Sequence, residues 1–138
     1  MSQPPLPPTS QQTQGEWAKF VSGFGYAFHG LWYALRTQRN ARVHAIIATL
    51  AILASIFFRI SPVEFAMIFV AITGVFIAEM FNTVIEICVD LASPTYHPLA
   101  KIAKDVAAGA VLLNAILSVV IGLFTLGPHL WIFLAHYL

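Results

Sequence analysis

The stretch EMFNTVIEICVDLASPTYHPLAKIAKD, from Glu79 to Asp105, is the most informative part of the chain. It carries four of the six acidic residues, and residues 65–78 before it are almost wholly apolar. On a helix, its first polar residues share a face about 80° wide, because successive residues turn by about 100°. The members of this acidic stripe are Glu79, Asn82, Glu86 and Asp90. A carboxylate in an apolar helix normally faces a bundle interior or a wet cavity, so the stripe marks a candidate functional site.

The composition is that of an integral membrane protein. Of the 138 residues, 59% are hydrophobic and only 9% are charged. The mean hydropathy of +0.79 lies well outside the range of soluble globular proteins. A net charge of +1 gives no indication of nucleic-acid binding. We therefore expect an all-α membrane protein whose topology follows the placement of its lysines and arginines.

The N-terminal region is expected to contain a disordered tail and a surface helix. Residues 1–15 are rich in Pro, Gln, Ser and Thr and offer little to fill a core, which predicts disorder. From about 16 to 36, apolar and aromatic residues recur at spacings of three and four, the period of a helix. Charges at Lys19 and Arg36, together with the aromatic residues, favour an amphipathic helix lying in the membrane interface over a span.

Three transmembrane helices are predicted after this surface helix. Their approximate ranges are 42–60, 62–92 and 99–126. Arginines precede the first span, and Lys101 and Lys104 open the third, so the positive-inside rule assigns these ends to the cytoplasm. The N-terminus is then inside, and the acidic stripe ends at the cytoplasmic face.

Local signals define the ends of the predicted spans. Ser61-Pro62 favours a helix start, with serine as the cap and proline at the first helical position. Gly127-Pro128 is expected to end the third span, and the last ten residues are too short to cross again. Residues 16–138 are thus predicted to form a single membrane domain.

The residue pattern alone leaves three kinds of function open for the acidic stripe. The carboxylates can pair with cations and only fix a bundle, they can pass protons or ions, or they can hold Mg²⁺ for phosphoryl chemistry. Lys104 suits the last alternative because a lysine neutralises phosphate. Neither a GxxxxGKS nor a Rossmann glycine pattern is present, so a nucleotide site must be built differently. His29, His44 and His97 are candidate switches or ligands, although a lone interfacial histidine is more often only hydrogen-bonded.

Two linked motifs resemble the prokaryotic diacylglycerol kinase family, which includes undecaprenol kinases. The first is ExxNTxIExxxD, from Glu79 to Asp90, and the second is HPLAKxAKDxAAGAVL, from His97 to Leu112. The form His97-Pro98-Leu99-Ala100 is closer to the undecaprenol kinase branch than to the diacylglycerol branch. The resemblance covers roughly residues 19–123.

The resemblance implies a small homotrimeric lipid kinase of the inner (plasma) membrane, with active sites formed between subunits at the cytoplasmic face. It implies transfer of the ATP γ-phosphoryl group, with Mg²⁺, to the hydroxyl of undecaprenol or diacylglycerol. Glu79 matches the proposed general base and Glu86 a metal and nucleotide ligand. Asn82 lies between them, and Asp90 belongs to the same motif. The positions that match further nucleotide contacts are Lys19 (where the family commonly has Arg), Tyr26, His97, Lys104 and Asp105.

Gln38 departs from the family pattern. Relatives usually carry a second metal-binding glutamate here, whereas this chain reads Thr37-Gln38-Arg39-Asn40. The Gln38 amide oxygen can still contact metal and nucleotide, but the site loses one negative charge. We therefore expect weaker Mg²⁺ binding than in relatives, and the change leaves room for a protein that keeps the fold with low kinase activity. Ala41 replaces an aromatic residue that many relatives carry.

Overall fold

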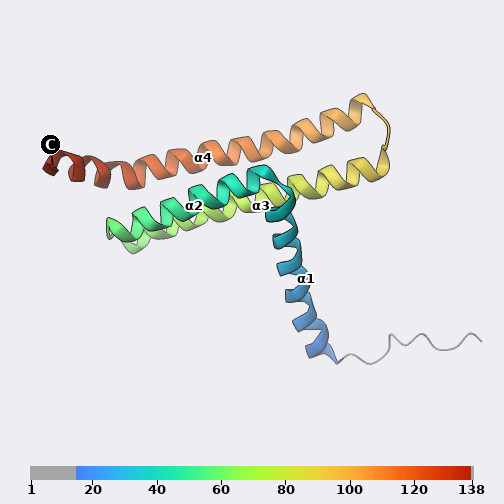
Figure 1. Ribbon diagram of the computed structural model, residues 1–138, viewed down its shortest axis with the longest axis horizontal. Coiled ribbons are helices and arrows are strands. Elements are labelled where there is room, and N and C mark those ends of the chain that lie inside the picture. The colour runs from blue at the N-terminus through green and yellow to red at the C-terminus, as the bar shows by residue number, and fades with distance from the viewer. Residues whose placement is uncertain (1–14, 138) are drawn as a thin grey trace, which may run out of the picture. The chain divides into compact units, whose positions relative to one another are not determined.

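The computed structural model describes residues 15–137; the expected disordered tail therefore lies, apart from Gly15, outside the described residues. These residues form helices and no strand, which confirms the predicted all-α class (Figure 1). The four helices are α1 (Glu16–Thr37), α2 (Arg39–Phe57), α3 (Pro62–Ala92) and α4 (Pro98–Tyr137). The chain divides into two compact units, one up to Tyr33 and one from Ala34 onward.

The first unit consists of the larger part of α1, in the described residues. Its aromatic side chains are largely exposed, with Trp17 at 81% and Phe28 at 69%. Neighbouring rings meet edge to face, with centroids 6.1 Å apart for Trp17 and Phe20 and 5.2 Å apart for Phe20 and Phe24. The predicted helix is confirmed as a helix, and its location in the membrane interface stays a prediction.

In the second unit, α3 and α4 run antiparallel along much of their length, and α2 lies against α3 (Figure 1). Within the described residues, α2, α3 and α4 are each long and apolar enough to cross a membrane. The 19 residues of α2 extend for about 28 Å. This length is close to the roughly 30 Å of a bilayer's hydrocarbon core. The three predicted spans thus have counterparts in three membrane-length helices.

Small side chains let these three helices approach one another, as is usual in membrane bundles. The buried apolar residues of the second unit are Ala34, Ala41, Ala48, Ile68, Ala71, Val75, Ala107 and Val111. Two side chains of α4 bond to the backbone of α3: Asn114 Nδ2 donates to the Gly74 carbonyl at 3.2 Å, and Ser118 Oγ donates to the Ala71 carbonyl at 3.1 Å. A Cβ at Gly74 would lie 3.0 Å from Asn114 Oδ1, so glycine permits this close crossing.

The turn between α2 and α3 begins earlier than predicted. We expected the first span to cover 42–60, but α2 runs from Arg39 to Phe57, and Arg59 takes a positive φ of 52° that ends the helical path. The predicted start of α3 is confirmed. Ser61 Oγ accepts a hydrogen bond from the Glu64 N–H at 3.3 Å, while the Ser61 N–H donates to Glu64 Oε2 at 2.8 Å. This reciprocal pair is a capping box with Pro62 at the first helical position.

The prediction that the helix of the third span ends at Gly127-Pro128 is wrong. Helix α4 begins one residue earlier than expected, at Pro98, and continues through Pro128 to Tyr137. The added turns are held by tertiary contacts that outweigh the hydrogen bond lost at a proline. The Phe133 ring lies 5.6 Å from that of Phe57, and the imidazole of His129 stacks on Phe58 with centroids 6.3 Å apart.

Candidate active site

The acidic stripe of α3 runs from a buried end to an exposed end. Glu79 is only 2% exposed and Asn82 only 7%, whereas Glu86 is half-buried and Asp90 is exposed. The Thr83 hydroxyl donates to the Glu79 carbonyl at 2.9 Å and so is engaged with its own helix. Burial therefore decreases along the predicted stripe, from Glu79 at the buried end to Asp90 at the exposed end.

At the middle of the stripe, the Glu86 carboxylate is held by two amides from different helices. Asn82 Nδ2 donates to Glu86 Oε1 at 2.9 Å, and Gln38 Nε2 donates to Glu86 Oε2 at 3.3 Å. Gln38 occupies the N-cap position of α2, but its side chain makes no capping hydrogen bond and reaches across to α3 instead. The structure thus brings together Gln38 and Glu86, the two residues predicted to contact the metal.

At the buried end, Glu79 contacts His44, which the sequence suggested only as a candidate switch or ligand. Nε2 of His44, on α2, lies 3.4 Å from Glu79 Oε1, and the His44 side chain is 20% exposed. This pair is close enough to interact but does not have hydrogen-bond geometry, so Glu79 Oε1 has no hydrogen-bond partner among the described residues, and neither has Asn82 Oδ1. Buried polar atoms are rarely left unpaired, so these two oxygens are candidate contacts for a ligand.

At the exposed end, the acidic stripe meets the start of α4. Lys104 Nζ lies 2.5 Å from Asp90 Oδ1, which joins the third span to the second. Asp105 pairs with Lys101 one turn before it, also at 2.5 Å, and both of these side chains are 60% exposed. Lys104, which the sequence suggested as a residue that neutralises phosphate, thus contacts the stripe, whereas the ion pair of Asp105 lies within α4.

The other predicted nucleotide contacts are exposed. The imidazole of His97 accepts a hydrogen bond from the Leu99 N–H at 3.2 Å, which satisfies one of the free amides at the start of α4. Lys19 and Tyr26 belong to the first unit, and both are exposed. The nucleotide roles of these three residues stay predictions.

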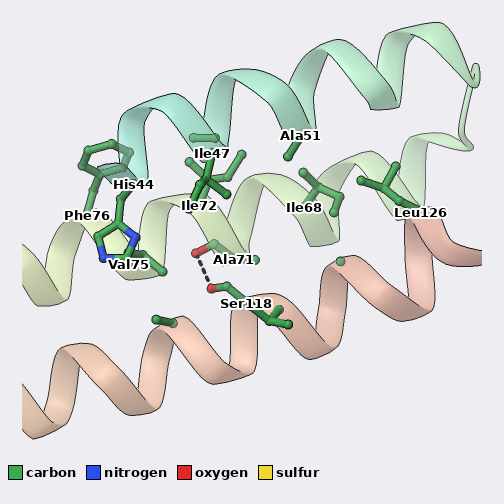
Figure 2. A pocket seen from close by; sticks show the side chains of 14 residues that line it. His44, Ile47, Ala51, Ile68, Ala71, Ile72, Val75, Phe76, Ser118 and Leu126 are labelled. Carbon is green, nitrogen blue, oxygen red and sulfur yellow. Dashed lines mark hydrogen bonds between the residues drawn. The ribbon is translucent and has the colours of Figure 1, made fainter. Parts of the chain in front are cut away.

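A mostly apolar cavity of about 240 Å³ lies among α2, α3 and α4, directly beside His44. Figure 2 shows His44 near Val75 and Phe76 at one end of the cavity, and Ile68 and Leu126 toward the other. Among the lining residues that the structure describes, His44 is the titratable one. Glu79 follows Val75 by one turn of α3, so it lies one helical turn from the end of the cavity that His44 lines.

The polar groups around Glu86 fit a hard cation that is bound together with phosphate. Within residues 15–137, no three His, Cys, Asp or Glu side chains gather into a complete metal site. Mg²⁺ usually takes one or two carboxylates and completes its shell with water and substrate phosphates. The Glu86 carboxylate, the unpaired Asn82 Oδ1 and the Gln38 amide supply oxygen donors of this kind. The donor set therefore suits Mg²⁺ that arrives with a nucleotide.

Comparison with known proteins assigns the chain to a family. Residues 25–126 match the sequence profile of the family described as prokaryotic diacylglycerol kinase. The chain belongs to this family of membrane lipid kinases, which confirms the resemblance.

Particular relatives agree with this class. The chain is 40% identical to the undecaprenol kinase of Bacillus subtilis over 121 residues, which cover 88% of this chain and 98% of that protein. It is 44% identical to a diacylglycerol kinase of Synechocystis sp. over 108 residues, which cover 78% of this chain but only 62% of that longer protein. Identity to the diacylglycerol kinase of Escherichia coli (strain K12) is 26% over 111 residues, which cover 80% and 91% of the two chains.

Proposed function

We propose that this protein transfers the γ-phosphoryl group of ATP, with Mg²⁺, to the hydroxyl of a long-chain membrane lipid. Undecaprenol is the first candidate acceptor and diacylglycerol the second. The observation that carries the proposal is the carboxylate of Glu79, which is 2% exposed, has an unpaired oxygen and contacts His44, a residue that lines an apolar cavity. The order of acceptors rests on the relation to the Bacillus subtilis undecaprenol kinase, which extends over 98% of that protein.

In this proposal the apolar cavity accommodates part of the lipid chain, and the lipid hydroxyl meets Glu79. A mostly apolar cavity of about 240 Å³ has room for a segment of hydrocarbon. Glu79 Oε1 accepts the hydroxyl proton as the acceptor oxygen attacks the γ-phosphorus. A positioned general base contributes roughly 10²- to 10⁴-fold to a rate.

The rest of the acidic stripe serves the nucleotide. Glu86, Asn82 and Gln38 would hold Mg²⁺, which neutralises phosphate charge when bound. Phosphoryl transfer depends mainly on such positioning and charge neutralisation. Lys104, paired with Asp90 at 2.5 Å, supplies a further positive charge at the open end of the stripe. The remaining proposed nucleotide contacts are Lys19, Tyr26, His97 and Asp105.

The assembly and orientation belong to the same proposal. We propose a homotrimer in the inner membrane with its N-terminus and active site at the cytoplasmic face. Exposed aromatic residues along α1 suit an interfacial helix. Large apolar side chains of α3 and α4, such as Phe69 at 59% and Leu113 at 70% exposure, suit contact with lipid or with neighbouring subunits.

The test is phosphoryl transfer from γ-labelled ATP in detergent–lipid micelles, with undecaprenol and diacylglycerol offered in parallel. We expect labelled lipid that requires Mg²⁺, disappears with EDTA and is lost in Glu79→Gln. The ratio of the two products ranks the acceptors. Folded protein that labels neither lipid, or a fully active Glu79→Gln, would overturn the proposal.

A further inference from the structure

His44 is the titratable side chain in direct contact with the buried end of the acidic stripe. Its Nε2 lies 3.4 Å from Glu79 Oε1, and its side chain is 20% exposed, against 2% for Glu79. The same imidazole lines the polar end of the apolar cavity (Figure 2). It therefore lies between the buried carboxylate and more accessible surroundings.

A buried general base needs a route by which it loses its proton after each turnover. The Thr83 hydroxyl donates to the Glu79 backbone carbonyl, so its proton is already engaged. The other carboxylate on this face, Glu86, is held by the amides of Asn82 and Gln38. No other described residue is recorded in an ion pair or side-chain hydrogen bond with the Glu79 carboxylate.

The third helix of the unit offers no alternative route. From α4, Ala115 and Ser118 line the cavity near His44. The Ser118 hydroxyl is bound to backbone carbonyls, at 3.1 Å from that of Ala71 and 2.9 Å from that of Asn114. Among the described residues, the titratable groups around this end of the stripe are thus Glu79 and Glu86 on α3 and His44 on α2, and of these only His44 touches Glu79.

We propose that His44 accepts the proton from Glu79 after each transfer step and passes it to water, an inference that rests on the function proposed above. In the transfer step, the acceptor O–H bond breaks and its proton binds Glu79. The acceptor oxygen bonds to the γ-phosphorus, and ADP leaves with the electrons of the broken P–O bond. The Glu79 proton then passes to Nε2 of neutral His44, and the imidazolium releases one proton to water.

Histidine suits this position because its charge changes near neutral pH. An imidazole can therefore accept a proton from a carboxylic acid and release one to water within the same cycle. His44 acts through Glu79 and not on the nucleotide, so we expect its loss to reduce kcat and to leave the KM for ATP nearly unchanged.

The experiment compares His44→Ala with the wild type, using the full chain in micelles and the lipid that the wild type phosphorylates. We expect kcat to fall by about 10²-fold, the lower end of the effects of positioned proton transfer. Added imidazole should restore the rate in proportion to its neutral form as the pH is varied, because free imidazole can carry the proton from the vacated position. A loss of packing alone would not respond in this way.

Two further variants complete the design. His44→Gln fills the same space with an amide that cannot carry a proton, so we expect it to be slow and unresponsive to imidazole; it tests the step even if the alanine variant fails to fold. His136→Gln, in the exposed last turn of α4, is the matched control and should behave as the wild type.

The outcomes separate the two proposals. A wild type without lipid kinase activity, or one that does not need Glu79, overturns the proposed function. If the wild type is active and depends on Glu79, the proposed function stands. The inference on His44 is then overturned if His44→Gln keeps the full kcat, or if imidazole does not raise the activity of folded His44→Ala.

Discussion

Helix α3 carries two glutamates that each lie beside a histidine, and the two pairs differ in their burial and in the other partners of the carboxylate. Glu64 Oε1 lies 3.2 Å from His129 Nε2, with both side chains 31% exposed. Glu79 Oε1 lies 3.4 Å from His44 Nε2, with exposures of 2% and 20%. The Glu64 carboxylate also accepts the Ser61 N–H at 2.8 Å, so both of its oxygens are engaged.

The difference teaches that partners and surroundings, not residue type, separate a structural carboxylate from a reactive one. Glu64 caps the start of a helix and links it to α4, where each hydrogen bond is a modest gain. Glu79 is more deeply buried, lacks a hydrogen-bond partner for one oxygen among the described residues, and contacts a histidine that lines a cavity. A buried carboxylate with an unpaired oxygen destabilises the folded protein and is typical of sites where a ligand binds.

The largest effect should come from changing the two glutamates in the same way. Glu79→Gln should lower lipid phosphorylation by about 10²- to 10⁴-fold, because the general base is lost. It should not lower thermal stability, since it removes a poorly paired buried carboxylate. Glu64→Gln should keep nearly full activity, because Glu64 lies about four turns of α3 from Glu79. The measurements are kcat with labelled ATP and melting in the same detergent.

An equal loss of activity in both variants would contradict the distinction between a structural Glu64 and a reactive Glu79. A melting temperature of Glu79→Gln far below that of the wild type would also contradict it, because the buried carboxylate would then be a structural element.

The acidic stripe was predictable because the physics that forms it is local. Four polar residues on one face of an apolar helix are recognisable from a constant rotation of about 100° per residue. The start of α3 was predictable for the same reason, since Ser61, Pro62 and Glu64 form a cap within four residues. The predicted second span, 62–92, has the same ends as α3.

The features that sequence reasoning missed depend on contacts between distant segments. Pro128 is a local signal to stop, but Phe133 contacts Phe57 and Phe58 at the end of α2, and α4 continues. His44 was considered only as a candidate switch or ligand, because its contact with Glu79 spans 35 positions of the chain. In retrospect, the sequence signal for a place of His44 near the stripe is its position shortly after Gln38, on the helix that faces the stripe.

A second prediction concerns the metal site and is smaller in effect. Gln38→Glu should lower the Mg²⁺ concentration for half-maximal activity several-fold, because a carboxylate would replace an amide 3.3 Å from Glu86. Asn40→Asp adds the same charge two residues away on an exposed side chain and is the matched control. Mg²⁺ titrations of activity give the comparison. An unchanged Mg²⁺ requirement in Gln38→Glu would contradict a metal role for position 38.

The smallest effect is expected at the structural end of α3. Ser61→Ala removes the hydroxyl that accepts the Glu64 N–H at 3.3 Å and so breaks half of the capping box. Such losses cost about 0.5–2 kcal/mol, which should appear as a lower midpoint of thermal unfolding in detergent. Activity at temperatures well below that midpoint should remain that of the wild type, because neither Glu79 nor His44 is touched.

Ser22→Ala is the matched control. The Ser22 hydroxyl donates to the Lys19 carbonyl of its own helix at 2.9 Å, and removal of this local hydrogen bond should leave the midpoint unchanged. If Ser61→Ala lowered kcat at low temperature while the protein stayed folded, the two ends of α3 would be coupled. The Glu64–His129 pair would then have to be treated as part of the reaction cycle, and the division of α3 into a structural and a reactive end would be wrong.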